Sequence, residues 1–414
     1  MESSIRLKCT LNRNYLPVDK KSVVYLAIDV IPPEFISKTQ TLASAICLVI
    51  DRSSSMGGHK FQKAKAAARN LLHQLQPGDY VSLVTFSSKV EEIVPLRKVQ
   101  DVDMVNLDRK IDQLRCGGGT ELYRGLDAAY QQFLRSGITG EDIVKRVILL
   151  SDGQPDDNLP QSFYVRLAKE MGDSGVSVMA LGIGDKYNED LLSEIAEHSR
   201  GMWKHISTAD DIPAIVSQQL EETRAVVAPR SQMVVRLADG VEIKAVYKFV
   251  PEALKVSDIK RDGSDITVPI GDITLGQPQT FVMQLAVAPA GEGERCLVKV
   301  QIPGEPASSQ DIMVTHTSDM SLWGVESDAF PRGIFLTAET QVLAREGLSG
   351  DKESLARAKE LAETILADTY LSIDAIHEAT TVVKRTVDRA EQGLSDEETK
   401  AAKQDVTQVM RRWQ

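Results

Sequence analysis

From about residue 43 to residue 223 the sequence alternates short apolar runs with segments whose apolar residues recur at helical spacing. The first run, 45–50, is apolar at every position, which is typical of a central parallel strand covered on both faces. The next segment, 60–75, has helical spacing and ends before Pro77-Gly78. Repetition of this unit predicts a parallel sheet with helices on both faces. The same patterns predict further strands at 80–86, 147–150 and 176–183, and helices at 107–114, 122–134, 163–173 and 189–198.

The residues on either side of this region have the period-two pattern of half-exposed β-strands. Before it, two apolar-alternating runs occupy 5–11 and 23–31, and Pro32-Pro33 ends the second. After it, alternating runs separated by Gly and Pro clusters indicate a β-sandwich. These later runs lie at 233–245, 266–270, 280–287, 296–302 and 311–315.

One turn in the sandwich region allows a prediction of register. A two-residue turn at Asp239-Gly240 would put the apolar residues of the flanking strands on opposite faces. A three-residue loop, 238–240, pairs Leu237 with Val241 and keeps one face apolar. We therefore predict a hairpin with Gly240 in a left-handed conformation.

The two N-terminal strands have no other partner in the sequence, so we expect them to complete the sandwich. The fold class is then multidomain, α/β plus all-β plus all-α, with a Rossmann-like domain inserted in a β-sandwich and helices at the C-terminus. The predicted divisions are N-terminal strands at 1–42, the α/β domain at 43–224, the sandwich at 225–333 and a helical region at 334–414.

The C-terminal region is helical and almost free of proline. Ser395-Asp396-Glu397-Glu398 matches a capping box at the start of the last helix. Two apolar stripes need a surface to pack against, which is either the sandwich and the neighbouring helices or a protein partner. The stripes consist of Leu355, Ala358, Ala362, Ile365, Leu366 and Tyr370, and of Val406, Val409, Met410 and Trp413.

The composition narrows the classes of partner and compartment. Among 414 residues, 59 are acidic and 48 basic, and the net charge of −11 argues against nucleic acid or an anionic membrane as the main partner. No apolar run approaches the length of a membrane-spanning helix, and the first residues lack the apolar stretch of a signal peptide. The four cysteines are scattered, as expected for reduced thiols. We therefore expect a cytoplasmic protein.

Polar side chains gather where the predicted strands end. Asp51, Ser53 and Ser55 follow the first buried strand, and Asp152 follows the strand at 147–150. Thr120 ends the glycine-rich stretch at 116–119. Ligands of open α/β sheets bind at this edge, and a set of oxygen ligands selects a hard cation such as Mg²⁺, Mn²⁺ or Ca²⁺. With two formal negative charges among the five residues, Mg²⁺ or Mn²⁺ is favoured.

Because of these motifs, the stretch from about residue 43 to residue 223 resembles a von Willebrand factor type A domain with an intact metal-ion-dependent adhesion site. The resemblance implies that Ser53 and Ser55 bind the metal directly. It implies that Thr120, Asp51 and Asp152 act directly or through water, and that an acidic side chain of a partner completes the coordination sphere. The residues after the motif, Gly57-Gly58-His59-Lys60, lack the acidic ligands of a second adjacent cation. Asp156 and Asp157 are interpreted as rim residues, with a turn-forming role as the alternative.

These observations favour a metal-dependent adaptor or assembly protein over an enzyme. The resemblance implies an assembly or regulatory subunit, with an AAA+ ATPase as one candidate partner. A Mg²⁺-dependent hydrolase is the alternative, although no second aspartate or nearby base completes such a site. A third reading makes the metal structural and assigns partner binding to the C-terminal helices.

Overall fold

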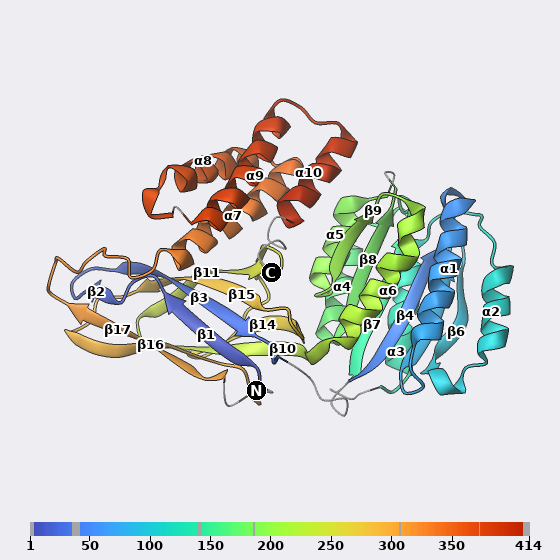
Figure 1. The fold of residues 1–414 in the computed structure, drawn as a ribbon, viewed down its shortest axis with the longest axis horizontal. Helices are drawn as coiled ribbons and strands as arrows, with labels where there is room; N and C mark the ends of the chain where they lie inside the picture. Colours follow the sequence, from blue (N-terminus) through green and yellow to red (C-terminus); the bar gives the residue numbers. More distant parts are fainter. Residues whose placement is uncertain are drawn as a thin grey trace. The chain divides into compact units, whose positions relative to one another are not determined.

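The computed structural model describes residues 4–34, 42–138, 143–184, 187–305, 308–371 and 373–408. The chain forms two compact units, which Figure 1 draws with colours that follow the sequence. One unit is Ser37–Pro229, and the other combines Met1–Ile36 with Arg230–Gln414. The chain of the second unit is therefore interrupted by the first, and the division at residues 42, 224 and 333 stays a prediction.

The first unit is an α/β sheet of six strands in the order β6-β5-β4-β7-β8-β9. All neighbouring strands are parallel except β6, which runs antiparallel to β5. The strands are β4 Ala43–Asp51, β5 Tyr80–Phe86, β6 Val90–Lys98, β7 Ile143–Ser151, β8 Val176–Ile183 and β9 Met202–Ile206. The helices are α1 His59–Gln74, α2 Met104–Gln113, α3 Leu122–Arg135, α4 Gln161–Asp173, α5 Glu189–His198 and α6 Ile212–Arg224.

Helices cover both faces of this sheet, as the apolar run at 45–50 predicted. Ile46, Leu48 and Ile50 of β4 belong to a core that also contains residues of α1, α2 and α6. The alternate residues, including Cys47 and Val49, pack with α3, α4 and α5 on the other face. The predicted α/β architecture is confirmed.

The two strands at the edges of the sheet, β6 and β9, were missed by the sequence patterns. Four of the nine residues of β6 are charged and the strand is mostly solvent-accessible, which is typical of an edge strand. In β9, four of the five residues are half-buried. An edge strand is covered incompletely, so its sequence lacks the continuous apolar run of a central strand.

The second unit contains a sandwich of two sheets. Their orders are β1-β3-β15-β11-β12 and β13-β14-β10-β16-β17-β2. Strand β3 lies between β1 and β15, with Ile28 opposite Phe281, and β2 runs parallel to β17. The strands are β1 Arg6–Leu11, β2 Tyr15–Pro17, β3 Ser22–Ile31, β10 Val226–Leu237, β11 Val241–Val250, β12 Leu254–Lys255, β13 Lys260–Asp262, β14 Asp265–Thr274, β15 Gln279–Val287, β16 Gly293–Gln301 and β17 Gln310–Thr317.

The predicted pairing of Leu237 with Val241 is wrong, although Gly240 does adopt a left-handed φ of 80°. Leu237 lies opposite Val298 of β16, and Val241 lies opposite Val287 of β15 in the other sheet. The loop therefore connects the two sheets. Because the inner faces of both sheets are apolar, the alternation around the loop fits facing sheets as well as it fits a hairpin.

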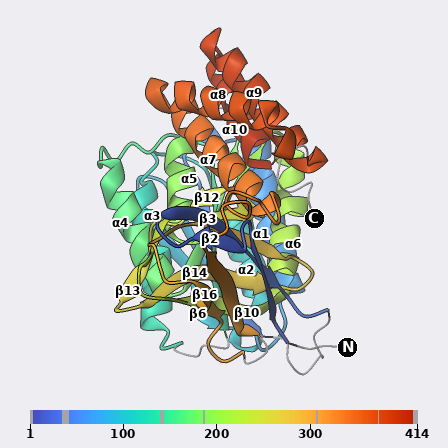
Figure 2. The ribbon, with the colours of Figure 1, turned by 90° about the vertical axis from the view of Figure 1, so that its left-hand side faces the viewer.

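In the described part of the second unit, four helices follow the sandwich: α7 Phe330–Leu348, α8 Lys352–Ala367, α9 Asp374–Glu391 and α10 Asp396–Gln408. Figures 1 and 2 both show α7 as the helix beside the sandwich, and Phe335 of α7 packs on Tyr25 and Tyr247 of the first sheet. No helix in the described residues combines the length and apolarity needed to cross a bilayer. Packing on the sandwich therefore accounts for part of the apolar helical surface.

The ends of these helices match the sequence patterns in part. The capping box is formed, since Glu398 N donates to Ser395 Oγ and Ser395 N donates to a Glu398 carboxylate oxygen. Tyr370 does not extend the stripe of α8, because it follows the end of that helix and is 78% exposed. Val406 is buried, whereas Val409, Met410 and Trp413 lie outside the described residues.

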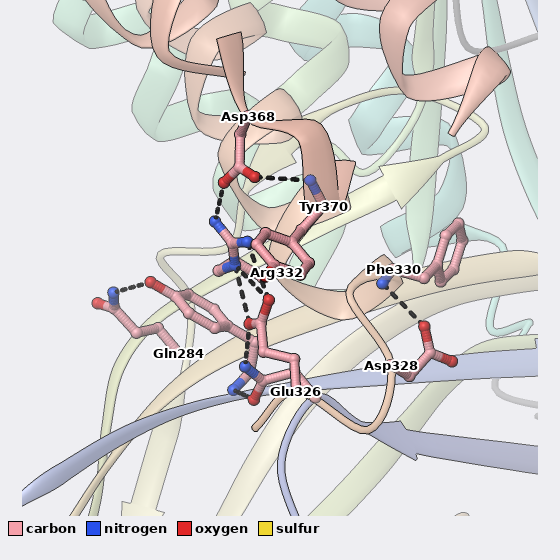
Figure 3. Close-up of polar contacts among 9 residues, drawn as sticks. Gln284, Glu326, Asp328, Phe330, Arg332, Asp368 and Tyr370 are labelled. Atoms are coloured by element: carbon pink, nitrogen blue, oxygen red, sulfur yellow. Dashed lines mark hydrogen bonds and ion pairs between the residues drawn. The ribbon is translucent and has the colours of Figure 1, made fainter. Parts of the chain in front are cut away.

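An ion-pair network joins α7 to the sandwich and to the turn after α8 (Figure 3). Arg332 Nε lies 2.8 Å from Glu326 Oε1, and Arg332 Nη1 lies 2.8 Å from Asp368 Oδ2. Asn12, just after β1, donates to the same Glu326 oxygen at 2.9 Å. The side chains of Glu326 and Asp368 are only 12% and 23% exposed, so each depends on the guanidinium for compensation of its charge.

Arg332→Met is expected to lower the free energy of unfolding by about 1–3 kcal/mol, because two poorly hydrated carboxylates lose their cation. Urea denaturation followed by circular dichroism measures this. Arg236→Met is the matched control, since Arg236 also holds one carboxylate with two nitrogens but is 57% exposed. Equal losses in the two variants would contradict a special role for the Arg332 network.

Candidate metal centre

The candidate site lies at the carboxyl ends of β4 and β7, which are adjacent parallel strands. Strand β4 ends at Asp51 and β7 ends at Ser151, directly before Asp152. Ile50 lies opposite Leu150, so the polar residues that follow reach the same level of the sheet. Three predicted ligands from the first strand end therefore meet one from the second.

Asp51 is fully buried and held by hydroxyl and amide donors. Its Oδ1 accepts a hydrogen bond from Ser53 N at 2.8 Å, and its Oδ2 accepts one from Ser151 Oγ at 2.7 Å. Burial raises the pKa of Asp51, and the nearby Asp152 charge adds to this, while the hydrogen bonds from Ser53 and Ser151 oppose it. A cation at the site would favour the ionised form of this carboxyl group.

Ser53, Ser55 and Asp152 form a continuous row of oxygens. Ser53 Oγ lies 3.0 Å from Ser55 Oγ, and Ser55 Oγ donates to Asp152 Oδ1 at 2.7 Å. Ser53 and Asp152 are buried, whereas Ser55 is exposed. The middle member of the row is therefore the exposed one, and an outside ligand can reach the row at Ser55.

Thr120 comes to the same place on the glycine-rich loop. A Cβ added to Gly153 would lie 3.4 Å from Thr120 Oγ1 and 3.5 Å from Ser55 Oγ. Both hydroxyl groups therefore lie close to Gly153. The loop is tied to the Asp51 turn by Gly117 N, which donates to Arg52 O at 2.8 Å. All five predicted residues, Asp51, Ser53, Ser55, Thr120 and Asp152, are thus gathered at one edge of the sheet.

The donor set fits a hard divalent cation. Octahedral Mg²⁺ has oxygen ligands at about 2.1 Å, which places neighbouring oxygens about 3.0 Å apart. The separations of 3.0 and 2.7 Å along the row are close to that value. No group of three or more His, Cys, Asp and Glu side chains suited to a metal occurs in the described ranges, so a cation here depends on hydroxyl oxygens as well as carboxylates.

Two residues that contact the site, Ser151 and Lys60, were not predicted from the sequence. Ser151 supports Asp51, as described above, and Lys60 Nζ lies 2.5 Å from Asp152 Oδ2. Lys60 is in the first turn of α1, which starts near the Asp51 loop. Ser151 could have been predicted, because it ends a strand next to the one that Asp51 ends. No local sequence pattern connects Lys60 with Asp152.

The other polar residues near the motif make local contacts. Asp156 Oδ1 accepts from Thr120 N at 2.8 Å, and Asp157 accepts from Tyr123 N at 3.2 Å and from the Tyr164 hydroxyl. Both aspartates therefore fix the loops around the site, while their effect on specificity stays a prediction. His59 is exposed, and its Nε2 lies 3.1 Å from Asp210 Oδ1.

Ser151→Ala is expected to weaken Mg²⁺ binding about ten-fold or more, because the buried Asp51 carboxylate loses a donor that orients it. Isothermal titration calorimetry with MgCl₂ measures the change. Ser136→Ala is the control, since Ser136 Oγ also makes a short hydrogen bond but to Phe133 O at the end of α3. Unchanged affinity in Ser151→Ala would contradict a supporting role for this hydroxyl.

Comparison with known proteins places this unit in a family. The model of the von Willebrand factor type A domain matches residues 45–221. An uncharacterised protein of Synechocystis, sll0103, is 23% identical over 330 residues, which cover 77% of this chain and 77% of that protein.

Two solved structures share the fold over nearly the whole chain. A von Willebrand factor type A protein from Catenulispora acidiphila has a TM-score of 0.77 at 16% identity, covering 98% of this chain and 97% of that one. The ArnB paralog VWA2 from Sulfolobus acidocaldarius has a TM-score of 0.59 at 18% identity, covering 98% of this chain and 100% of that one. Residues 45–221 of this chain are a von Willebrand factor type A domain.

Proposed function

We propose that this domain binds a divalent cation, Mg²⁺ in the cell, and through it a carboxylate of a protein partner. The observation that carries the proposal is the gathering of oxygen-bearing side chains at one edge of the sheet, where Ser53 Oγ lies 3.0 Å from Ser55 Oγ and Ser55 Oγ lies 2.7 Å from Asp152 Oδ1. Von Willebrand factor type A domains generally mediate protein–protein interaction. A protein-binding role therefore agrees with the family and with the donor set.

The five residues would contact the cation in different ways. Ser53 and Ser55 would be direct ligands, and Thr120, Asp51 and Asp152 would act directly or through water. The bound cation supplies positive charge and an open coordination position. Its two charges, added to that of Lys60, exceed those of Asp51 and Asp152 by one, which favours an incoming anion such as a carboxylate.

Catalysis is less well supported than binding. A Mg²⁺-dependent hydrolase needs a base or nucleophile beside the cation. Among the described side chains, Lys60 pairs with Asp152, and His59 faces Asp210. We therefore propose an adaptor or assembly role, with an AAA+ ATPase as one candidate partner on the basis of the family resemblance.

The test uses a minimal carboxylate probe, the blocked peptide acetyl-Gly-Asp-Gly-amide, with the Asn peptide as its counterpart. Ligand-observed NMR should detect binding of the Asp peptide with Mg²⁺, and its loss with a chelator or in Asp51→Asn. The melting temperature of Asp51→Asn should stay near that of the wild type, because Asn keeps the shape of the side chain. Asp210→Asn removes the same charge at a position that is 67% exposed, and should leave binding intact.

Other outcomes would overturn the proposal in distinct ways. Loss of folding on Mg²⁺ removal would make the metal structural and direct attention to the C-terminal helices. Mg²⁺-dependent hydrolysis of p-nitrophenyl phosphate that Asp51→Asn abolishes would establish the hydrolase. Equal binding of the Asp and Asn peptides would exclude carboxylate recognition.

A further inference from the structure

A pocket of about 400 Å³ adjoins the candidate metal centre within the same unit. Gly58, which ends the loop that carries Ser53 and Ser55, forms part of its wall. The remaining lining comes from α1, from the end of α2 and from the turn that leads to the glycine-rich loop.

Lys65 is the most unusual residue of this pocket, because it is a lysine with only 5% of its surface exposed. Its ammonium group donates to Asp112 O at 3.3 Å and lies 5.6 Å from the centre of the Phe61 ring. Among the described residues, no carboxylate lies within ion-pair distance of it. An ammonium group has three N–H donors, and one of them bonds to Asp112 O. Lys65 therefore offers further donors and a poorly hydrated positive charge to the pocket.

Arg115 adds a second cation to the same wall. Its Nη1 donates to the carbonyl oxygens of Asp112 and Leu114, at 2.7 and 3.0 Å, while the side chain remains exposed. The one acidic residue of the lining, Asp112, forms an ion pair with Arg69 and so does not neutralise Lys65 or Arg115. The pocket is therefore locally positive on a chain whose net charge is −11.

Cys116 links the pocket to the metal centre electrostatically. Burial raises the pKa of the Cys116 thiol, the charges of Asp51 and Asp152 add to this, and the charges of Lys65 and Arg52 oppose it. Its side chain thus lies within the fields of both groups. Gly58 is three residues from Ser55, a separation that the chain spans in at most about 11 Å.

We propose that this pocket takes a second carboxylate of the same protein partner, so that the partner presents two acidic residues on one short segment. The first carboxylate completes the metal sphere, and the second pairs with Lys65 and Arg115. In an extended segment, residues two apart lie on one face about 7 Å apart, so a short acidic segment can present both carboxylates to the same side of the domain. The inference rests on the proposed function, because it assigns the chemistry of the partner around the coordinating acid.

The experiment compares peptides with one and two acids. The series acetyl-Gly-Asp-(Gly)n-Asp-Gly-amide places the second Asp one to four residues after the first, and each member has a counterpart with Asn as the second residue. Affinities are measured with Mg²⁺ by ligand-observed NMR. At the best spacing, the second Asp should strengthen binding to the wild type about ten-fold, the effect of one charged hydrogen-bonded contact.

Two variants test the pocket. In Lys65→Gln and in Arg115→Gln the advantage of the second Asp should fall markedly, while the Asn peptides should bind as they do to the wild type. Arg115 is exposed, so Arg115→Gln decides the matter if the buried Lys65 substitution prevents folding. Lys110→Gln is the matched control. Lys110 is an exposed lysine of α2 that lines a neighbouring pocket and does not line this one.

The outcomes separate this inference from the one on which it rests. If no peptide binds the wild type in a Mg²⁺-dependent way, the proposed function fails and the second-carboxylate site fails with it. If single-acid peptides bind but the second Asp brings no gain at any spacing, only the present inference is overturned. An equal loss of the gain in Lys110→Gln would also overturn it, because general attraction would then explain the effect.

Discussion

The parallel pairing of β4 with β7 is the constraint on which the candidate metal centre depends. Ile50 lies opposite Leu150, so the first polar residues after two apolar strands, Asp51 and Ser151, arrive together. Their contact, 2.7 Å from hydroxyl to carboxylate, lies where no water can replace it, since both residues are fully buried. A slip of one residue would turn Asp51 toward the helices on the opposite face and would separate it from its donor.

Two carboxylates in this buried position carry an electrostatic cost that several groups offset. Asp51 receives hydrogen bonds from Ser53 and Ser151, and Asp152 receives them from Ser55 and Lys60. Repulsion between the two acids nevertheless helps to raise the pKa of Asp51. A divalent cation would remove this repulsion, and the surplus of positive charge would then attract an acidic partner. The same arrangement thus connects the stability of the site with its proposed specificity.

The sequence patterns predicted best where burial is complete. The predicted strands at 80–86 and 176–183 have the bounds found in the structure, and those at 45–50 and 147–150 lie within β4 and β7; all four are interior strands of the sheet. The edge strands β6 and β9 escaped prediction because half-exposed backbone imposes a weaker pattern. In the sandwich, the left-handed Gly240 was predicted correctly but the partners of its strands were not. Alternation shows which face of a strand is buried, and it does not show which strand lies beside it.

The sequence by itself determined which side chains are candidate ligands, since the motif Asp51-Arg52-Ser53-Ser54-Ser55 follows a buried strand and its Asp and Ser side chains offer only oxygen atoms. Only the tertiary structure decided which groups surround those oxygens. Ser151 lies 100 residues from Asp51, and Lys60 lies 92 residues from Asp152. The buried Lys65 likewise reads as an ordinary helical lysine until α1 packs beside the end of α2. Ligand type and strand periodicity are local properties of a sequence, whereas contacts over such separations depend on the order in which strands and helices pack.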